Sequence, residues 1–261
     1  MRRHPKCYAA ELGACSDDIS AEHFFSKGIL TLLNDGPNFG VSGFPWQEPE
    51  QAAQLSPATL AAKILCTRHN SELSLLDDEC LTVFQFVEQA HKTLSDTQCE
   101  GDRSYEVSGD LVERWVLKAL IGLVASGNAA KGDKRISKDK PPLAWLQLLY
   151  GLEAMPEEWG LYLTSQVGDR VMSTRGLAFA PLIHDMKVIG CLLTIHDCRF
   201  LLAMSTPGAD RHGSLLENAI YRPAHLRFVH TDRRCSVQLL LKWRDQRAGR
   251  GIEIRYSGAA A

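Results

Sequence analysis

The chain has 261 residues, 45% of them hydrophobic, and a formal net charge of −2. This length allows either one large domain or two small ones around a sizeable core. The near-neutral charge argues against a bulk polycation, although residues 222–255 hold nine Lys/Arg against three Asp/Glu. That segment is either a solvated basic face or a surface for an anionic partner.

Residues 1–20 carry charge but no apolar stretch of the kind found in signal peptides. No apolar run approaches the roughly 18 residues of a membrane span, so we expect a cytoplasmic protein with no membrane partner. The eight cysteines are spread along the chain, unlike those of secreted disulfide scaffolds. We therefore expect mostly reduced thiols, and metal binding in preference to disulfides.

In chain order, the first 80 residues are rich in Gly, Pro and polar signals and predict an irregular module. The apolar spacing from 76 to 94 predicts an amphipathic helix, and the polar residues 95–106 predict a loop. The apolar stretch 108–130 predicts a helix that Ser108 or Asp110 can cap. A charged loop over 130–142 and a further helix from 143 follow.

After about residue 158 the chain consists of short apolar runs separated by polar or Gly/Pro residues, which predicts an antiparallel sheet. The expected fold class is therefore α+β, with domains at 1–95, 96–157 (the helical linker region) and 158–261 (the β-rich domain, of unknown role). Within the β-rich part, we interpret His184-Asp185 and His196-Asp197 as strand ends, and Cys191 and Cys198 as core thiols. Cys235 follows two arginines that can lower the pKa of a thiol.

Two ligand pairs divided by a long insert point to a metal. Cys7 and Cys15 are followed, about fifty residues later, by Cys66 and His69 in a C-x-x-H step. Three thiolates and an imidazole suit a closed tetrahedral zinc site, and a turn around Gly13 would close the long first gap. The alternative is four unrelated residues, namely two buried thiols, a surface cysteine and a core histidine. Zinc is favoured because a small loop-rich module usually needs a staple.

The order of these residues resembles that of HNH-type ββα-metal fingers, a treble-clef group that includes many endonucleases. In that family a zinc knuckle precedes a strand that ends in an acidic-His pair, and a second zinc pair opens a helix. Glu22-His23 and Asn70 stand at the matching positions, within roughly residues 5–80. The family's Asn before the second zinc pair is missing from TLAAKILC, the sequence before His69, which puts catalysis in doubt more than the fold.

The resemblance implies that His23 is a general base, since imidazole titrates near neutral pH. It also implies that Glu22, Asn70 and Asp77 hold one Mg²⁺ or Mn²⁺ ion, while the zinc is structural. The plainer interpretation makes Glu22-His23 a helix start, Asn70 a polar cap and Asp77 the cap of a helix from 78.

The sequence therefore predicts a zinc-stapled, HNH-like finger that cleaves nucleic acid, DNA in preference to RNA, with metal help. The alternative is a non-catalytic zinc-finger scaffold that binds a nucleic acid, a protein partner or a second copy of the chain. A third interpretation makes the β-rich half a sensor of a small ligand.

Overall fold

The computed structural model describes residues 3–33, 39–41, 53–128, 130–131, 134–135, 140–164, 177–195, 198–208, 212–245 and 249–256. The chain forms two compact units. Unit 1 is made of Met1–Asp78, Arg114–Met155 and Asp185–Lys187, and unit 2 of Glu79–Glu113, Pro156–His184 and Val188–Ala261. The units interleave along the chain, unlike the consecutive domains expected above, whose boundaries stay a prediction.

The helices follow the apolar spacing of the sequence. The α-helices are α1 (Lys27–Leu32), α2 (Thr67–Ser71), α3 (Ser74–Ser95), α4 (Gly109–Ser126) and α5 (Leu143–Leu149); short 3-10 turns are η1 (Ala10–Leu12), η2 (Pro57–Leu60) and η3 (Gly213–Leu216). The three longer helices expected from the sequence are thus confirmed. The Ser108 hydroxyl accepts a hydrogen bond from the Leu111 amide at 3.3 Å, as expected of a cap.

Unit 1 is built on small two-stranded sheets. Strand β1 (Ile19–His23) pairs antiparallel with β4 (Ala61–Cys66), so that Ile19 lies opposite Cys66 and His23 opposite Ala61. The other pairs are β2 (Phe39–Val41) with β3 (Ala53–Leu55) and β6 (Ala130–Lys131) with β7 (Lys134–Arg135). Sheets this small can bury little apolar surface in a core, which agrees with the irregular module that the loop-rich sequence predicts.

The part of α4 that belongs to unit 1 supplies much of this unit's core. Its side chains Trp115, Leu117 and Leu120 are fully buried. Phe24, just after β1, packs so closely on the helix that a methyl group added at Gly122 would lie 3.3 Å from its ring. Burial on all sides explains why this stretch of sequence is apolar around the whole helix.

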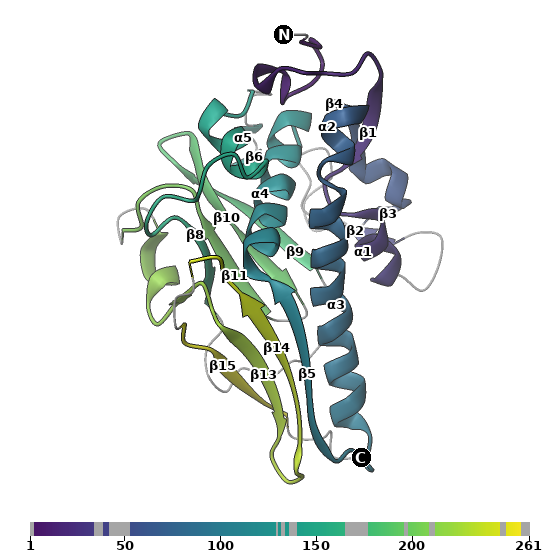
Figure 1. Ribbon diagram of the computed structural model, residues 1–261, viewed down its shortest axis with the longest axis vertical. Coiled ribbons are helices and arrows are strands. Elements are labelled where there is room, and N and C mark those ends of the chain that lie inside the picture. Colours follow the sequence, from purple (N-terminus) through teal and green to yellow (C-terminus); the bar gives the residue numbers. More distant parts are fainter. Residues whose placement is uncertain are drawn as a thin grey trace. The chain divides into compact units, whose positions relative to one another are not determined.

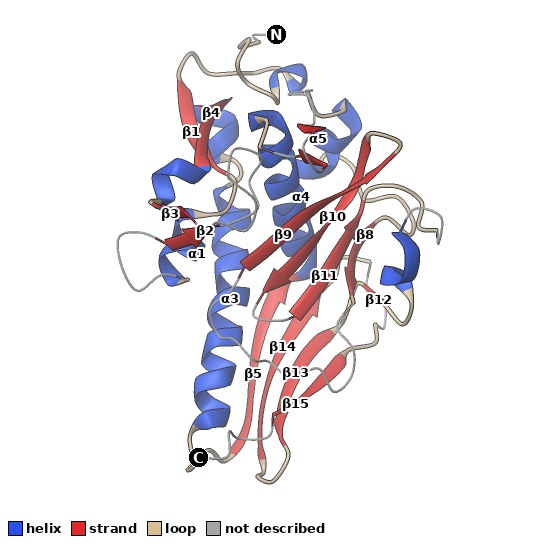
Figure 2. Cartoon of the chain, turned by 180° about the vertical axis from the view of Figure 1, so that it is seen from behind, coloured by secondary structure: helices blue, strands red, loops and turns tan. Residues whose placement is uncertain are grey.

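The described residues of unit 2 form two sheets, whose strands are labelled in Figures 1 and 2. The five-stranded sheet has the order β12-β8-β11-β10-β9 and the four-stranded sheet the order β15-β13-β14-β5. Their bounds are β5 (Gly101–Ser108), β8 (Gly160–Leu163), β9 (Leu177–His184), β10 (Lys187–Ile195), β11 (Cys198–Ala203), β12 (Ile220–Tyr221), β13 (His225–His230), β14 (Cys235–Lys242) and β15 (Ile252–Tyr256).

Two expectations for this unit are wrong. The sheet is not purely antiparallel, because β13 pairs parallel with β15 and β14 pairs parallel with β5. The stretch 95–106 is not all loop, because β5 begins at Gly101. β5 lies at an edge of its sheet with most side chains exposed, so its polar sequence lacks the alternation that marks a half-buried strand.

Helix α3 covers one face of the four-stranded sheet. The Phe86 ring lies 5.6 Å from that of Tyr105 on β5 and 5.7 Å from that of Phe228 on β13. Further along, the ring of His91 contacts that of Tyr256 on β15 at 5.4 Å. One helix thus spans the sheet from edge to edge and buries its apolar face there.

The chain contains a disulfide between Cys99 and Cys235, 136 residues apart. Six cysteines are free, in line with the expectation of mostly reduced thiols, but the expected absence of a disulfide is wrong for this pair. Cys235 has no titrating thiol while it is bonded. The parallel pairing of β5 with β14 places Cys235 opposite Gly101, which brings the two cysteines together. Cys191 and Cys198 are buried on β10 and β11, as expected of core thiols.

The pair His184-Asp185 ends β9 and enters a turn in which Asp185 and Met186 have φ of 46° and 61°, which confirms the strand-end interpretation. His196-Asp197 lies outside the described residues. Among the helices that the structure describes, none is long and apolar enough to cross a membrane.

Removing the disulfide tests how much it stabilises unit 2. A bond that closes so long a loop restricts the unfolded chain strongly, so breaking it should lower the free energy of unfolding by roughly 2–4 kcal/mol. Urea unfolding of the Cys99→Ser, Cys235→Ser double variant against the oxidised chain measures this. A Cys191→Ser variant alters a buried thiol of unit 2 outside the bond, so it keeps the disulfide and should lose stability on reduction as the wild-type chain does.

Candidate metal centre

The first two cysteines are brought together by a tight loop. Cys7 begins a turn in which its carbonyl accepts from the Ala10 amide at 3.1 Å, and η1 follows. Gly13 then adopts φ of 81° and its amide donates to the Ala10 carbonyl at 3.0 Å. Glycine adopts this positive φ at no steric cost, so the turn expected at Gly13 closes the gap to Cys15.

The second pair lies where β4 becomes α2. Cys66 is both the last residue of β4 and the N-cap of α2, and His69 follows within the first turn. One helical turn places residues i and i+3 on the same side, so both side chains face the cysteine loop. The Tyr8 amide donates to the Ile64 carbonyl at 2.9 Å, which ties that loop to β4.

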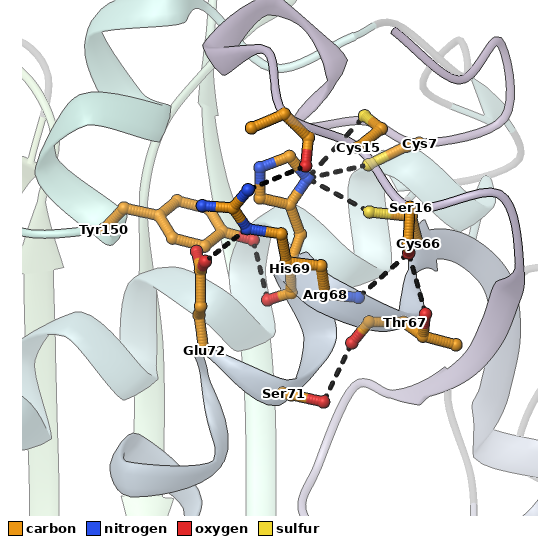
Figure 3. A network of polar contacts seen from close by, with 11 residues as sticks. Cys7, Cys15, Ser16, Cys66, Thr67, Arg68, His69, Ser71, Glu72 and Tyr150 are labelled. Carbon is orange, nitrogen blue, oxygen red and sulfur yellow. Dashed lines mark hydrogen bonds and ion pairs between the residues drawn. The ribbon is translucent and has the colours of Figure 1, made fainter. Parts of the chain in front are cut away.

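These four side chains form a compact cluster, which we call the CCCH cluster (Figure 3). Their ligand atoms all lie within 4.8 Å of one another and all four residues are buried. The His69 Nδ1 atom lies 3.4, 3.8 and 3.3 Å from the sulfurs of Cys7, Cys15 and Cys66. A tetrahedral zinc with bonds of about 2.0–2.3 Å sets its ligand atoms about 3.5–3.8 Å apart, so the cluster has the size such an ion needs.

Neighbouring groups hold the ligands in place. The Tyr150 hydroxyl donates to the His69 carbonyl at 3.1 Å, and the two rings meet edge to face at 5.4 Å. The Ser16 hydroxyl accepts from the Arg68 amide at 3.1 Å and shares a 2.7 Å hydrogen bond with Thr67. Figure 3 shows these contacts around the His69 ring and the start of α2. Supporting bonds of this kind orient metal ligands.

The electrostatics of the cluster suit a cation. Burial, with repulsion from Cys66 and Cys15, raises the pKa of the Cys7 thiol to about 12. Burial also acts on Cys66, but hydrogen bonds from His69 and Ser16 outweigh it and lower the pKa of that thiol. Burial lowers the pKa of His69 and keeps its ring neutral. A divalent cation would stabilise all three thiolates at once, because the ion's charge removes their mutual repulsion.

The residues expected to hold a catalytic metal lie elsewhere in unit 1. Glu22 and His23 end β1, so the alternative that they begin a helix is wrong. Asp77 lies in the first turn of α3, which starts at Ser74, so Asp77 does not cap a helix from 78. Asn70 is half-buried in α2, and its carbonyl accepts from the Leu73 amide at 3.1 Å.

A lysine from α4 lies between the two expected acidic ligands. The Lys118 ammonium is 2.8 Å from Glu22 Oε1 and 2.7 Å from Asp77 Oδ1. Lys118 is 1% exposed and Glu22 2% exposed, so water does not screen this pair. Burial acts to lower the pKa of Lys118, but the two carboxylates raise it above its usual value. The place where a divalent ion would bind these acids therefore already holds a positive charge.

Asp77 is further engaged by neutral donors. The Ser26 hydroxyl donates to Asp77 Oδ1 at 2.5 Å, and the Trp115 indole donates to the same oxygen at 3.1 Å and to Ser26 Oγ at 2.8 Å. With Lys118, three donors thus converge on one carboxylate oxygen of α3, one from the N-cap of α1 and two from α4. This is the pattern of a buried structural network that fixes packing.

His23 is the one expected catalytic residue with a suitable protonation state. Burial, with Lys118 and Lys27 nearby, lowers its pKa, and Asp77 opposes this in part. The ring is therefore neutral near pH 7 and able to accept a proton. Its side chain is only half-buried, so solvent reaches it.

Sequence reasoning missed Lys118, Trp115 and Tyr150, although one signal was present. Glu113 and Lys118 are isolated charges within an otherwise apolar helix, and buried charges almost always have a partner. That rule predicts a buried acid facing Lys118, but no spacing in the sequence names Glu22 or Asp77 as that acid.

Replacing one ligand tests the metal centre. We expect the wild-type chain to contain one zinc ion, and Cys66→Ser to lose it and to unfold in unit 1 at a lower temperature, since the staple is gone. Serine is a good helix N-cap, so the change removes a ligand without weakening the start of α2. Elemental analysis and calorimetry measure the two effects.

Cys80→Ser provides the matched control, because it also alters a buried thiol but lies outside the cluster. It should keep the zinc content of the wild type. Equal zinc loss in both variants, or a metal-free wild type, would contradict the assignment.

Removing the buried ammonium tests the Glu22–Lys118–Asp77 network. Lys118→Met should lower the free energy of unfolding at pH 7 by about 3–5 kcal/mol, because it leaves a buried carboxylate without its partner. Burial raises the pKa of Glu22, so the folded state takes up a proton more readily than the unfolded chain as the pH falls. The loss should therefore be smaller at pH 5 than at pH 7.

Urea unfolding of Lys118→Met at the two pH values measures this, with zinc content as a check that the cluster survives. Lys63→Met is the control, since Lys63 is exposed on β4. An effect of Lys118→Met no larger than that of the control would show that the network carries no stability.

Comparison with known proteins adds no family to this geometry: no family model matches the chain, and no curated protein or solved structure is significantly similar to it. A CCCH cluster alone does not name a family, since unrelated folds hold metals with these ligands.

Proposed function

We propose that the CCCH cluster holds one structural zinc ion and that unit 1 is a non-catalytic scaffold that binds a partner. The ligand set supports a structural site, because four buried protein ligands leave no open position for water or substrate. Three thiolates with one imidazole favour zinc over magnesium or calcium, which prefer oxygen ligands.

The observation that carries the non-catalytic assignment is the position of Lys118. Metal-dependent cleavage of a phosphodiester needs an ion that reaches both the acidic ligands and the phosphate. In unit 1 the ammonium of Lys118 lies between Glu22 and Asp77, and at 1% exposure it cannot itself contact a phosphate. A metal would have to displace a buried, hydrogen-bonded cation, which is costly.

A protein partner is favoured over nucleic acid by the ion pairs of unit 2. Part of the basic excess over 222–255 is neutralised by acids that lie elsewhere in the chain. Lys242 pairs with Glu106 at 3.3 Å, and Arg222 pairs with Glu113 at 2.8 Å. Arginines paired in this way have less charge to offer to phosphates.

The second candidate is the HNH-like endonuclease. It is favoured by the order of elements, since β1 ends in Glu22-His23, β4 pairs with β1, and the zinc pair opens α2 directly after β4. His23 is also neutral and reached by solvent, as a general base must be. In this alternative a conformational change would have to free Glu22 from Lys118.

A plasmid-nicking assay separates the two candidates. We expect the zinc-loaded chain to show no nicking in Mg²⁺ or Mn²⁺ above that of a His23→Ala variant, because no catalytic ion binds at Glu22 and Asp77. His184→Ala, in a strand of unit 2, is the matched histidine control. Nicking that persists in His184→Ala and disappears in His23→Ala, with zinc content unchanged, would establish the endonuclease and overturn the scaffold.

A further inference from the structure

A surface hollow of about 990 Å³ lies in unit 2 where the chain enters β5. It is lined by residues 97–102 and by residues from β13, the following turn and β14. Both half-cystines of the disulfide, Cys99 and Cys235, are part of this lining. The disulfide is thus not enclosed in a core on all sides but borders a space large enough for a small molecule.

The hollow has a surplus of positive charge. Its lining includes Arg227, Arg233 and Arg234 against two carboxylates, Glu100 and Asp102. The Arg233 guanidinium donates to the Leu94 and Asp96 carbonyls, which are neutral acceptors that fix the group without cancelling its charge. Arg234 is exposed beside Cys235.

The one acid paired across the hollow compensates only part of this charge. Asp102 lies 3.8 Å from Arg227, and its side chain is 76% exposed. Exposed pairs of this kind are weak because water screens them. The three arginines of the lining outnumber its two exposed acids, so positive charge remains in the hollow and favours an anion there.

We propose that the Cys99–Cys235 disulfide is a thiol–disulfide exchange site for a small anionic thiol, whose carboxylates bind the arginines of this hollow. The proposal does not rest on the proposed function, because the CCCH cluster belongs to unit 1 and every residue of the hollow to unit 2.

The proposed order of attack follows from the relative exposure of the two cysteine residues. Cys99 is 6% exposed and Cys235 2% exposed, so the incoming thiolate attacks Cys99 Sγ. The Cys99–Cys235 bond breaks, its electron pair leaves on Cys235 Sγ, and a mixed disulfide forms at Cys99. Arg233 and Arg234 precede Cys235 and stabilise the leaving thiolate.

A second thiol then completes the exchange. It attacks the mixed disulfide, takes the first thiol as its partner and releases the Cys99 thiolate. Two small thiols lose two electrons in total and the protein disulfide gains two, while both cysteine thiolates take up protons from solvent. The reduced chain keeps only non-covalent contacts here, such as the 2.8 Å hydrogen bond from the Gly101 amide to the Arg234 carbonyl.

The experiment compares thiols of different charge on the folded, oxidised full-length chain. Reduced glutathione serves as the anionic thiol, 2-mercaptoethanol as the neutral one and cysteamine as the cationic one. Alkylation and mass spectrometry give the rate of disulfide opening, and each rate is divided by that thiol's rate with an uncharged small disulfide. At low salt this ratio should be about tenfold higher for glutathione than for 2-mercaptoethanol, and lowest for cysteamine.

Two variants place the effect at the hollow. Arg234→Gln should reduce the preference for glutathione at least threefold, because it removes one of the positive charges that attract the anionic thiol. Added salt should also reduce the preference, because it screens this attraction. Arg244→Gln removes another exposed charge of unit 2, one that lies outside the hollow, and should leave the preference intact. Circular dichroism checks that both variants fold like the wild type.

Three results would overturn the proposal. One is equal normalised rates for the three thiols, and another is a preference that Arg234→Gln does not change. The third is opening only at the rate of global unfolding, which a urea series reveals because that rate rises with denaturant. A mixed disulfide with glutathione trapped on Cys99 would support the proposed order of attack, and one on Cys235 would contradict it.

Discussion

Unit 1 depends on one constraint, the convergence of two chain segments on the CCCH cluster. The His69 ring meets Cys7 and Cys15 across sequence separations of 62 and 54 residues. In the described residues between these segments lie short strands and helices, and closing so long a loop costs conformational entropy. A metal bound at the cluster would supply this free energy at a single point, next to β1, β4 and α2.

The buried Lys118 is a second contact that holds elements of unit 1 together. Lys118 reaches from α4 to Glu22 on β1 and Asp77 on α3, so one ammonium ties three elements together. A charged contact tolerates fewer arrangements than an apolar one, because any misplacement leaves a buried ion unpaired. The same contact gives Glu22, which the sequence resemblance assigns to a catalytic metal, a buried partner within the fold.

Whether an interaction can be predicted from the sequence depends on how far apart its residues lie along the chain. The C-x-x-H step of Cys66 and His69 and the turn at Gly13 are local, so spacing and backbone preference predict them. The helices from 76 and 108 are local in the same sense, since apolar spacing alone marks them. The parallel pairing of β5 with β14 is not local, and neither are the disulfide that follows from it and the position of Lys118, because no periodicity links residues so far apart.

The distribution of charge shows the same difference between what is local in the sequence and what the fold brings together. Counting residues 222–255 alone suggests a basic surface, but the fold brings the acids of β5 and α4 against these arginines and lysine. Glu113 lies 109 residues before Arg222, and their pairing is buried. A tally along the chain therefore measures the charge of a segment, whereas the field that a partner meets depends on which segments lie side by side. The hollow beside Cys235 retains positive charge for the same reason: the Arg233 guanidinium is held by neutral carbonyls, and the acids of the hollow are exposed to water.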